Sequence, residues 1–410
     1  MRFVSRVQGA VRSLFGRDLE QKSIKLVDPQ ASEIFGYVPT VAGPSITAAT
    51  ALRVPAVHSA IVLISEALGA LPAKVFAADD SGKRTTKDHP AYRLVHDEAN
   101  DWTSAGQLRA ALTADALLHD HGFAYANRVN GRVQEFIRLD PRTVTVKAHE
   151  TTGEPVYEVQ DGARKRTYPY TEILHISAPL GIAPIKAGRE AIALSAVLEQ
   201  HAGRLFAGGA RPSGVLLKDK RAGSGDDGKT IIGNVRKAYK AWMNSGTGEP
   251  LILDDGWTYT SSAMTSTDAQ FLENRRFQLE EIARVFRVPP HLLFDLSRAT
   301  WSNAEEMFQS FLTLTLRSWL DAWEWAYARV LLTPDERAAG YYVEFVVDDL
   351  LTANAATRAT TYAQYRSMGA MTANEVRAGL NLPSRDGGDI LANPYTTSST
   401  TTLTNTGEAA

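Results

Sequence analysis

The chain of 410 residues contains no cysteine. Disulfide bonds are therefore excluded, and zinc sites built on cysteine ligands are excluded with them. A cysteine-free sequence of this length fits a protein that folds in a reducing cytosol. Because 44% of the residues are hydrophobic, the chain can form sizeable cores without such cross-links, and its length predicts two or three domains.

A strong charge of one sign is also missing. The sequence has 44 Lys and Arg against 46 Asp and Glu, which gives a formal net charge of −2. A protein that coats nucleic acid uses a basic surface to release counterions from the phosphates. The composition therefore argues against a nucleic-acid coat protein.

The sequence also lacks an uninterrupted apolar run of membrane-spanning length. The most apolar stretch, Val54 to Phe76, carries Glu66 and Lys74 and is broken by Pro55 and Pro72. This pattern predicts a buried amphipathic helix and no membrane partner.

The first 17 residues carry four arginines and no acidic residue, but they have no continuous apolar segment of the kind found in secretory signals. We expect these residues to form a mobile basic N-terminal arm, with an ordered contact to nucleic acid or to a capsid as the alternative.

Two helical patterns on either side of a hinge dominate the second half of the chain. The first covers residues 268–286 and stops at Pro289 and Pro290, which remove backbone donors and disfavour helical geometry upstream. The second begins after Asn303 and continues to about Leu332. Such a helix would be roughly 45 Å long, more than a compact domain needs. Long helices joined by a short polar loop suggest part of an assembly.

Before these helices, apolar periodicities and turn signals predict a mixed α+β unit over residues 50–180 with an antiparallel meander. Asn130-Gly131 and Asp161-Gly162 are the hairpin signals, because these residue types tolerate positive φ. The helices are expected over residues 56–70, 89–100 and 104–122, and the strands over 72–79, 124–129, 133–139, 144–149, 156–160, 165–169 and 173–177.

A helix over residues 185–206 leaves this unit, and the helix over 268–286 returns to it. Between them lies a small insert, with strands expected over 213–218, 249–254 and 257–263 and a helix over 229–244.

Several segments, taken in order, resemble the portal proteins of tailed double-stranded DNA phages, in the branch typical of long-tailed phages. They include VPAVHSAIVLISEALGALPAKVF, ILHISAPLGIAPIKAGREAI, LENRRFQLEEIARVFRVPPHLLFDLSRATWSNAEEMFQSFLTLTL, VEFVVDDLL and MGAMTANEVRAGLNLP. The order and spacing of these segments carry the resemblance, and no single short motif does. Two mild departures are Ala183, where the family often has Ser, and the run His119-Asp120-His121, where a Gly-Asn pair is common.

The resemblance implies an α+β portal fold with wing, stem, clip and crown regions, assembled into a ring. Its implied boundaries are an N-terminal arm at 1–49, the wing at 50–184, stem helix 1 at 185–208, the clip at 209–266, stem helix 2 at 267–288, a tunnel loop with a long helix and a wing strand at 289–351, the crown at 352–395 and a disordered tail at 396–410.

The resemblance also implies a non-enzymatic function. The subunit would form a ring, usually of twelve copies, at one vertex of a capsid, and double-stranded DNA would be packaged and ejected through its axis. The implied partners are the terminase, head-completion proteins and the major capsid protein, in a virion assembled in a bacterial host cytoplasm. A gene transfer agent portal would share this biochemistry. Walls of mixed sign suit a DNA conduit, because a strongly basic channel would hold the phosphates.

By the same resemblance, three groups of residues are candidates for function. The tunnel loop is expected to touch passing DNA, the stem arginines to face the channel, and the basic clip residues to dock partners. The tunnel-loop residues are Ser297, Arg298, Ala299, Thr300, Trp301, Ser302 and Asn303; the stem residues are Arg204, Arg275, Arg276 and Arg284; the clip residues are Lys218, Lys220, Arg236, Lys237 and Lys240.

A different class of function is suggested by residues Gly223 to Thr230, which match the phosphate-binding pattern GxxxxGK[ST] between an expected strand and an expected helix. This pattern alone would predict a P-loop nucleotide-binding enzyme centred on Lys229. Against it, Asp226 and Asp227 place negative charge where phosphates would bind, and the insert is too short for the parallel sheet that supports such loops.

Other candidate chemistry has simpler interpretations. His119 and His121 lie two residues apart, so they cannot chelate a metal together from one helix face, and His175 is expected to be a hydrogen-bonded core residue. No metal, cofactor or catalytic triad is predicted. The aromatic stripe Trp319, Trp323, Trp325 and Tyr327 is expected to pack in the core or between subunits.

Overall fold

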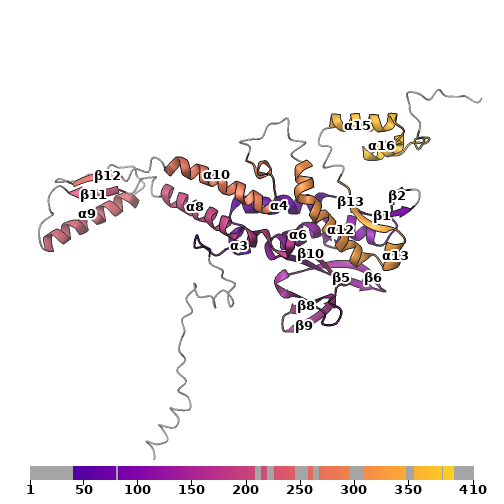
Figure 1. Cartoon of the computed structure of the whole chain (residues 1–410), viewed down its shortest axis with the longest axis horizontal. Coiled ribbons are helices and arrows are strands. Elements are labelled where there is room, and N and C mark those ends of the chain that lie inside the picture. Colours follow the sequence, from indigo (N-terminus) through magenta and orange to yellow (C-terminus); the bar gives the residue numbers. More distant parts are fainter. Residues whose placement is uncertain are drawn as a thin grey trace, which may run out of the picture.

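The computed structural model describes residues 40–79, 82–207, 214–218, 226–244, 257–261, 267–295, 309–347, 355–380 and 382–391. An α/β body, made of the described residues 40–187 and 288–347, holds the main core. Two helices extend from one end of this body to a distal lobe, and two C-terminal helices lie above the half of the body away from that lobe (Figure 1). The helix pair is α8 (Arg189–Ala207) and α10 (Thr267–Phe286), the distal lobe is β11 (Gly214–Lys218), α9 (Asp226–Asn244) and β12 (Trp257–Ser261), and the C-terminal helices are α15 (Ala355–Ser367) and α16 (Ala373–Gly379).

The main core lies between three helices of the body. They are α4 (Pro55–Ala70), α6 (Ala105–His119) and α12 (Arg317–Leu331). Helix α6 begins where expected, because the Ser104 side chain accepts the Gln107 N–H in a capping box. Helices α4 and α6 cross with glycines in contact: a Cβ at Gly106 would lie 2.5 Å from the carbonyl oxygen of Gly69.

The aromatic stripe on α12 is largely buried. Trp319, Trp323 and Tyr327 are all in the core, and the Trp323 indole N–H donates to the Thr113 hydroxyl at 3.1 Å. The expectation of core packing is confirmed for these three residues. It is wrong for Trp325, which is 64% exposed, because it lies two positions from Trp323 and so faces away from the core.

The predicted meander forms two three-stranded antiparallel sheets. One has the order β10-β5-β6 and the other β7-β8-β9, and a small second core of Phe123, Tyr157 and Ile173 lies beside them. The strands are β5 (His121–Val129), β6 (Arg132–Leu139), β7 (Val144–Ala148), β8 (Pro155–Asp161), β9 (Arg164–Pro169) and β10 (Ile173–Ser177).

The hairpin at Asn130-Gly131 is confirmed, with φ of 51° and 79°. The second hairpin lies one residue later than predicted: Asp161 pairs with Arg164, so the turn is Gly162-Ala163.

The third sheet joins distant parts of the chain in the order β13-β1-β2. Strand β1 (Ala73–Asp79) pairs on one side with β2 (Gly82–Thr85) and on the other with β13 (Tyr341–Phe345), with Ala73 opposite Phe345. Helix α12 lies just before β13 in the chain and packs against it. The second half of the chain therefore completes the core that the first half begins.

Three helix predictions need correction. The helix expected over 104–122 ends at His119, because residues His121–Val129 form β5. The helix expected over 89–100 is only α5 (Ala91–His96), because residues Glu98–Asn100 form β3, which pairs with β4 (Thr103–Ser104). The first helix of the pair is interrupted at Gly188, with the short α7 (Pro184–Ala187) before it.

The long helix described from Gln309 onward contains a π-helical turn, η5 (Leu312–Leu316), before α12. Its expected start at Asn303, the strand expected over 249–254, the N-terminal arm up to residue 39 and the C-terminal tail lie outside the described residues.

Within the described part of the chain, no helix is both long enough and apolar enough to span a bilayer. The stretch from Val54 to Phe76 instead contains α4 and most of β1, and α4 buries six of its side chains. The expectation of a buried amphipathic helix is confirmed.

Candidate functional site

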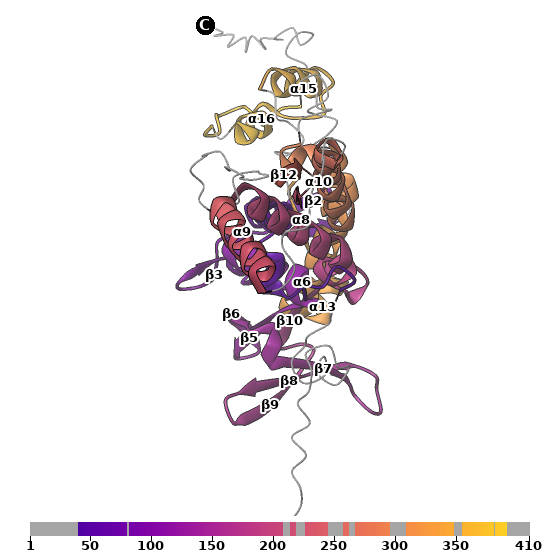
Figure 2. The same ribbon diagram turned by 90° about the vertical axis from the view of Figure 1, so that its left-hand side faces the viewer.

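The most distinctive feature outside the core is the pair of helices α8 and α10, which lie side by side and carry the distal lobe (Figures 1 and 2). Close packing at their base depends on Gly188, where a Cβ would lie 2.7 Å from a methyl carbon of Val285. The pair therefore leaves the body as one packed unit.

The four stem arginines predicted from the sequence are all exposed on this helix pair. Arg284 forms an ion pair with Glu281 one turn before it. Arg275 lines a shallow hollow together with Glu199 and Leu279, facing α8 and the start of α4. Because successive residues on a helix are turned by about 100°, Arg276 points to a different side from Arg275. The four arginines therefore do not share a single face.

The base of the helix pair is tied to the body through Asp120. This residue has a φ of 73°, and its carboxylate accepts the Ala183 N–H at 2.7 Å and forms an ion pair with Lys186. Burial acts to raise the pKa of Asp120, but the contacts with Lys186 and Ala183 outweigh it and the pKa is lowered. The carboxylate therefore stays ionised and anchors α7 to the end of α6.

Backbone strain is concentrated around the same base. The described non-glycine residues with positive φ are Asn130, in its hairpin, and Asp120, Leu180, Arg287 and Phe294, in or next to this junction. The π turn lies here too, since the Thr315 hydroxyl donates to the Arg287 carbonyl at 2.5 Å. Residues held in sparsely populated conformations cluster at functional or switching sites.

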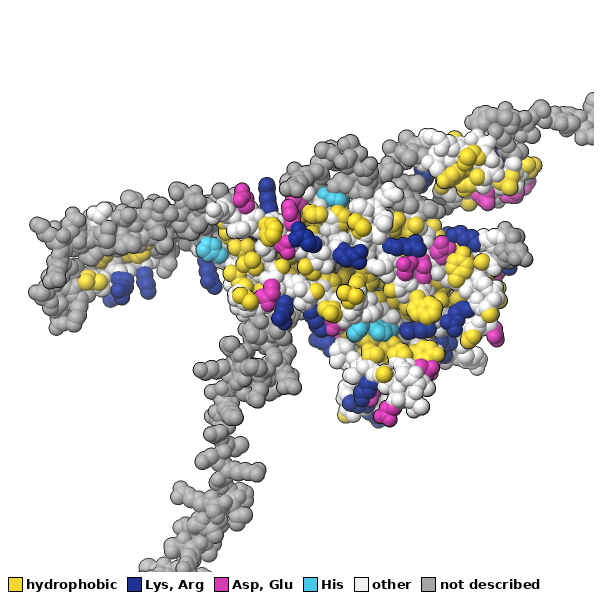
Figure 3. Space-filling model, in the orientation of Figure 1, with side chains coloured by type: hydrophobic (Ala, Val, Ile, Leu, Met, Phe, Trp, Pro, Cys, Tyr) yellow, Lys and Arg dark blue, Asp and Glu magenta, His cyan; other side chains and the backbone are white. Residues whose placement is uncertain are grey.

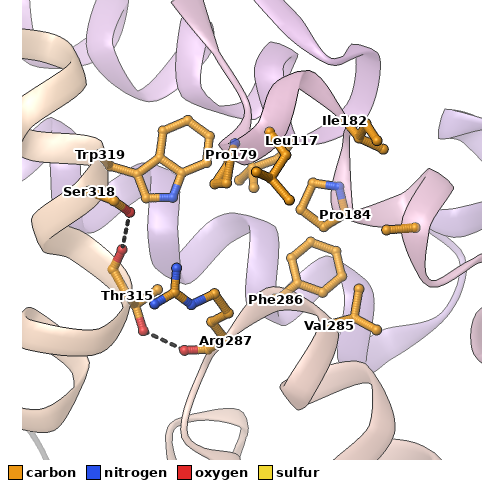
Figure 4. A pocket seen from close by; sticks show the side chains of 12 residues that line it. Leu117, Pro179, Ile182, Pro184, Val285, Phe286, Arg287, Thr315, Ser318 and Trp319 are labelled. Carbon is orange, nitrogen blue, oxygen red and sulfur yellow. Dashed lines mark hydrogen bonds between the residues drawn. The ribbon is translucent and has the colours of Figure 1, made fainter.

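These segments enclose an apolar hollow of about 430 Å³, which we call the junction hollow. Its walls come from the end of α6, the turn at 179–182, α7, the end of α10 and the start of α12. Figure 4 shows Phe286, Pro184 and Trp319 around it, with the Arg287 guanidinium pointing inward. An open apolar hollow with one cation suits a docking group with an aromatic and an acidic part.

The histidines noted in the sequence form a hydrogen-bonded chain beside this junction. His175 contacts the Tyr157 hydroxyl through Nδ1 at 3.0 Å and His121 Nδ1 through Nε2 at 3.1 Å. Burial lowers the pKa of His175 to about 3, helped by His121 and Arg329, and burial also lowers the pKa of His121. His175 is thus the buried, hydrogen-bonded histidine expected. Among the described residues, no group of three or more His, Asp or Glu is arranged to hold a metal ion.

The nucleotide-binding alternative does not fit the distal lobe. Helix α9 starts at Asp226, so Asp226, Asp227, Gly228 and Lys229 are already helical and cannot form the nest of N–H groups that cradles phosphates. The lobe's two described strands, β11 and β12, form an antiparallel pair, whereas a P-loop is carried by a parallel sheet.

The basic residues predicted for docking do not all lie on one element. Arg236, Lys237 and Lys240 are exposed on α9, and Lys240 lies one turn after the adjacent pair Arg236 and Lys237. Figure 3 shows Lys and Arg side chains gathered along this helix. Lys218 ends β11, and Lys220 lies outside the described residues. The tunnel-loop residues Ser297 to Asn303 also lie outside them, between Asp295 and Gln309.

The sequence analysis missed the residues that shape the junction hollow. Leu180 and Arg287 looked unremarkable, because positive φ at a leucine or an arginine has no sequence signature. The run Pro179-Leu180-Gly181 could have signalled a tight turn, and the Arg287 to Pro290 segment marked a helix end.

An elongated chain with a compact α/β body, a projecting helix pair and a docking hollow at their junction defines a structural subunit of an assembly. The chain belongs to the phage portal protein family, whose sequence model matches residues 55–381. It is 28% identical over 356 residues to the portal protein of Enterobacteria phage HK97, covering 83% of this chain and 81% of that one. It is 27% identical over 410 residues to the probable portal protein of Streptomyces phage phiC31, with coverage of 92% and 86%.

Solved structures share the fold at lower identity. A chain from the neck of an empty gene transfer agent particle aligns with a TM-score of 0.56 and 22% identity, covering 88% of this chain and all of that one. An HK97 family phage portal protein from Corynebacterium diphtheriae aligns with a TM-score of 0.55 and 20% identity, covering 77% and 99%. The predicted α+β portal fold is confirmed.

Proposed function

We propose that this chain is the subunit of a portal ring at one vertex of a phage or gene transfer agent capsid, through which double-stranded DNA is packaged and ejected. The observation that carries the proposal is the family match over residues 55–381, which spans the body and the helix pair together. One related fold belongs to a particle neck computed with C12 symmetry, which supports a ring of twelve copies.

In this proposal each region of the chain has its own role. The helix pair is the stem, and Arg204, Arg275, Arg276 and Arg284 supply weak, separated contacts to DNA phosphates. The distal lobe is the clip, and the basic face of α9 with Arg236, Lys237 and Lys240 docks the terminase and later head-completion proteins. The C-terminal helices form the crown, and the body forms the wing that meets the major capsid protein. The loop at 297–303 narrows the tunnel.

The role is geometric and needs no catalysis or cofactor. A sliding duplex must be guided without being held, and each phosphate contact adds to the salt dependence of binding. The arginines lie on different helix faces, and Arg284 is already paired with Glu281. They can therefore guide the DNA while binding it only weakly.

Electron microscopy of the purified protein tests the proposal most directly. We expect class averages of closed rings with a central hole, and light scattering at a mass of many subunits across a concentration series. A stable monomer at every concentration, or a closed globular oligomer without a hole, would contradict it. The particle itself then supplies the second test: portal protein detected at a single vertex supports the location in the virion, and its absence from particles refutes it.

A further inference from the structure

The junction hollow has an exposed apolar rim that a single subunit leaves uncovered. Leu180 is 97% exposed and Ile182 51%, and both line the hollow. Single exposed apolar residues are common, but two of them at the edge of an apolar hollow indicate a docking surface. Leu180 also has a φ of 60°, a strained conformation for a leucine, and contacts with a bound neighbour would help to hold it.

The opposite side of the molecule carries a projecting aromatic residue. Figure 2 shows the β3 region projecting on one side, while α10, whose end lines the hollow, lies toward the other. The turn between β3 and β4 consists of Asp101 and Trp102, and Trp102 is 72% exposed. Exposed tryptophans on rigid supports are the usual anchors of protein interfaces.

This turn is held rigidly. The Trp102 N–H donates to the Asn100 side chain at 3.2 Å, and the same side chain donates to the Phe136 carbonyl at 2.7 Å in strand β6. Asn100 is 5% exposed, so its two hydrogen bonds are shielded from water. Trp102 is therefore presented in a fixed position, which lowers the entropy lost on docking.

The charges at the two places are complementary. Asp101 is exposed beside Trp102, and Arg287 points into the junction hollow (Figure 4). Within the described residues, neither side chain has an oppositely charged group within 4.0 Å. A docked pair would gain a charge-assisted contact, and the indole could stack on the guanidinium.

We propose that Trp102 of one subunit inserts into the junction hollow of the adjacent subunit, where Asp101 pairs with Arg287. The inference rests on the proposed ring, since a ring repeats one contact between two different faces of neighbouring copies. A hollow of about 430 Å³ has room for an indole, and an interface aromatic of this kind buries roughly 150–250 Å². A second copy is the favoured occupant because the chain itself carries both complementary halves, on opposite sides.

Charge reversal tests the pairing. Asp101→Arg and Arg287→Asp should each weaken ring assembly at least tenfold in the concentration at half-assembly, measured by light scattering. The double variant should recover most of the loss, because the pair is restored in the opposite orientation. Thermal melting of each variant at a concentration below assembly checks that the subunit still folds. Folded single variants that assemble like wild type would overturn the proposal.

The aromatic contact has a matched control within the chain. Trp102→Ala should weaken assembly strongly, whereas Trp325→Ala, which removes a similarly exposed tryptophan outside the junction hollow, should not. Equal effects of the two substitutions would contradict a specific role for Trp102.

Because the sequence has no cysteine, a designed pair gives a direct readout. The variant carrying Thr103→Cys and Ile182→Cys keeps Trp102 and places one cysteine beside each half of the proposed contact. On oxidation it should form a ladder of cross-linked multimers up to the full ring, and neither single variant should pass beyond a dimer. Rings of this double variant that form no ladder on oxidation would overturn the inference while leaving the portal ring intact. A wild-type protein that forms no ring would instead refute the proposed function.

Discussion

At the scale of single residues, the body depends on one buried arginine that the sequence did not single out. Arg109 is 2% exposed, and its guanidinium donates to the carbonyls of Leu68, Gly69 and Leu71 at the end of α4 and to that of Val95. Each of these carbonyls would otherwise be left without a partner at a helix end. A planar fork of five donors suits this role better than an ammonium group does.

We therefore expect Arg109→Leu to reduce the free energy of unfolding by about 3–5 kcal/mol, because it leaves several buried carbonyls unsatisfied. Arg109→Lys should recover only part of the loss. Urea unfolding at fixed protein concentration measures the effect, and the exposed Arg142→Leu serves as control with a much smaller change. Equal effects of Arg109→Leu and the control would contradict this account.

A second residue-scale prediction concerns acid. The folded protein holds His175 neutral, with a pKa of about 3, whereas an unfolded chain protonates its histidines near 6.5. The stabilisation is fully present above pH 6.5 and is lost as the pH falls toward 3, since only the unfolded chain takes up the proton. The shift corresponds to about 5 kcal/mol.

Unfolding midpoints at pH 7.5 and pH 4.5 test this expectation. His175→Asn keeps a partner for the Tyr157 hydroxyl but cannot be protonated, so its midpoint should fall less between the two pH values than that of wild type. The exposed His58→Asn should keep the wild-type pH dependence. If His175→Asn is as acid-sensitive as wild type, the acid response has another origin.

At the scale of elements, the base of the helix pair is closely packed because of a glycine. Gly188→Ala would place a methyl group within 2.7 Å of Val285, pushing α8 away from α10 at its base. We expect a loss of about 1–3 kcal/mol, as for other overpacked contacts. Val285→Ala in the same chain should restore much of it, because the space is then available.

Gly203, within α8, provides the control. A Cβ there meets nothing within 4 Å, so Gly203→Ala should be neutral or stabilise by up to about 1 kcal/mol through helix propensity. Denaturant midpoints of both variants decide the matter, and a stabilising Gly188→Ala would show that the helices can move apart freely.

The sequence predicted elements whose signal is local. Helix α6 was identified from Ser104 and its periodicity, and the strands of the meander from turn residues such as Asn130 and Gly131. The predictions were wrong where contacts between residues far apart in the chain determine the local structure. Residues 98–100 lie in a helical pattern, yet they form β3, where Asn100 bonds to the Phe136 carbonyl in β6. The π turn at Leu312–Leu316 is likewise associated with a long-range contact, from Thr315 to the Arg287 carbonyl.

At the scale of the whole molecule, the family followed from the resemblance of ordered segments, whereas the junction hollow could not be foreseen. Its walls come from segments around residues 117, 180, 286 and 317, and no sequence pattern reports that such distant positions meet. The exposed side of the hollow can also be recognised only in the structure. Amphipathic periodicity distinguishes buried from exposed helix faces, but it does not distinguish free surfaces from interfaces.

The proposed tunnel loop is tested in the assembled particle. If residues 297–303 touch passing DNA, changing Arg298 and Trp301 to alanine should leave rings, capsids and the melting temperature nearly unchanged while impairing the packaging or retention of DNA. Nuclease-protected DNA per particle is the measurement. Normally filled particles would refute the contact, and a large drop in melting temperature would instead indicate packing against the wing.

The pairing of β1 with β13 also has a consequence for synthesis. Strand β1 leaves the ribosome early, but its partner at Tyr341–Phe345 and the helix α12 that covers the core are made only after the helix pair and the distal lobe have been translated. Until then the nascent chain exposes an unpaired strand edge and an open core, a state that chaperones recognise and that aggregates readily. A prematurely terminated chain that stops before Arg317 can carry both helices of the pair but cannot close its body. Truncated translation products would thus be removed by quality control before they could enter a ring and leave it with a defective sector.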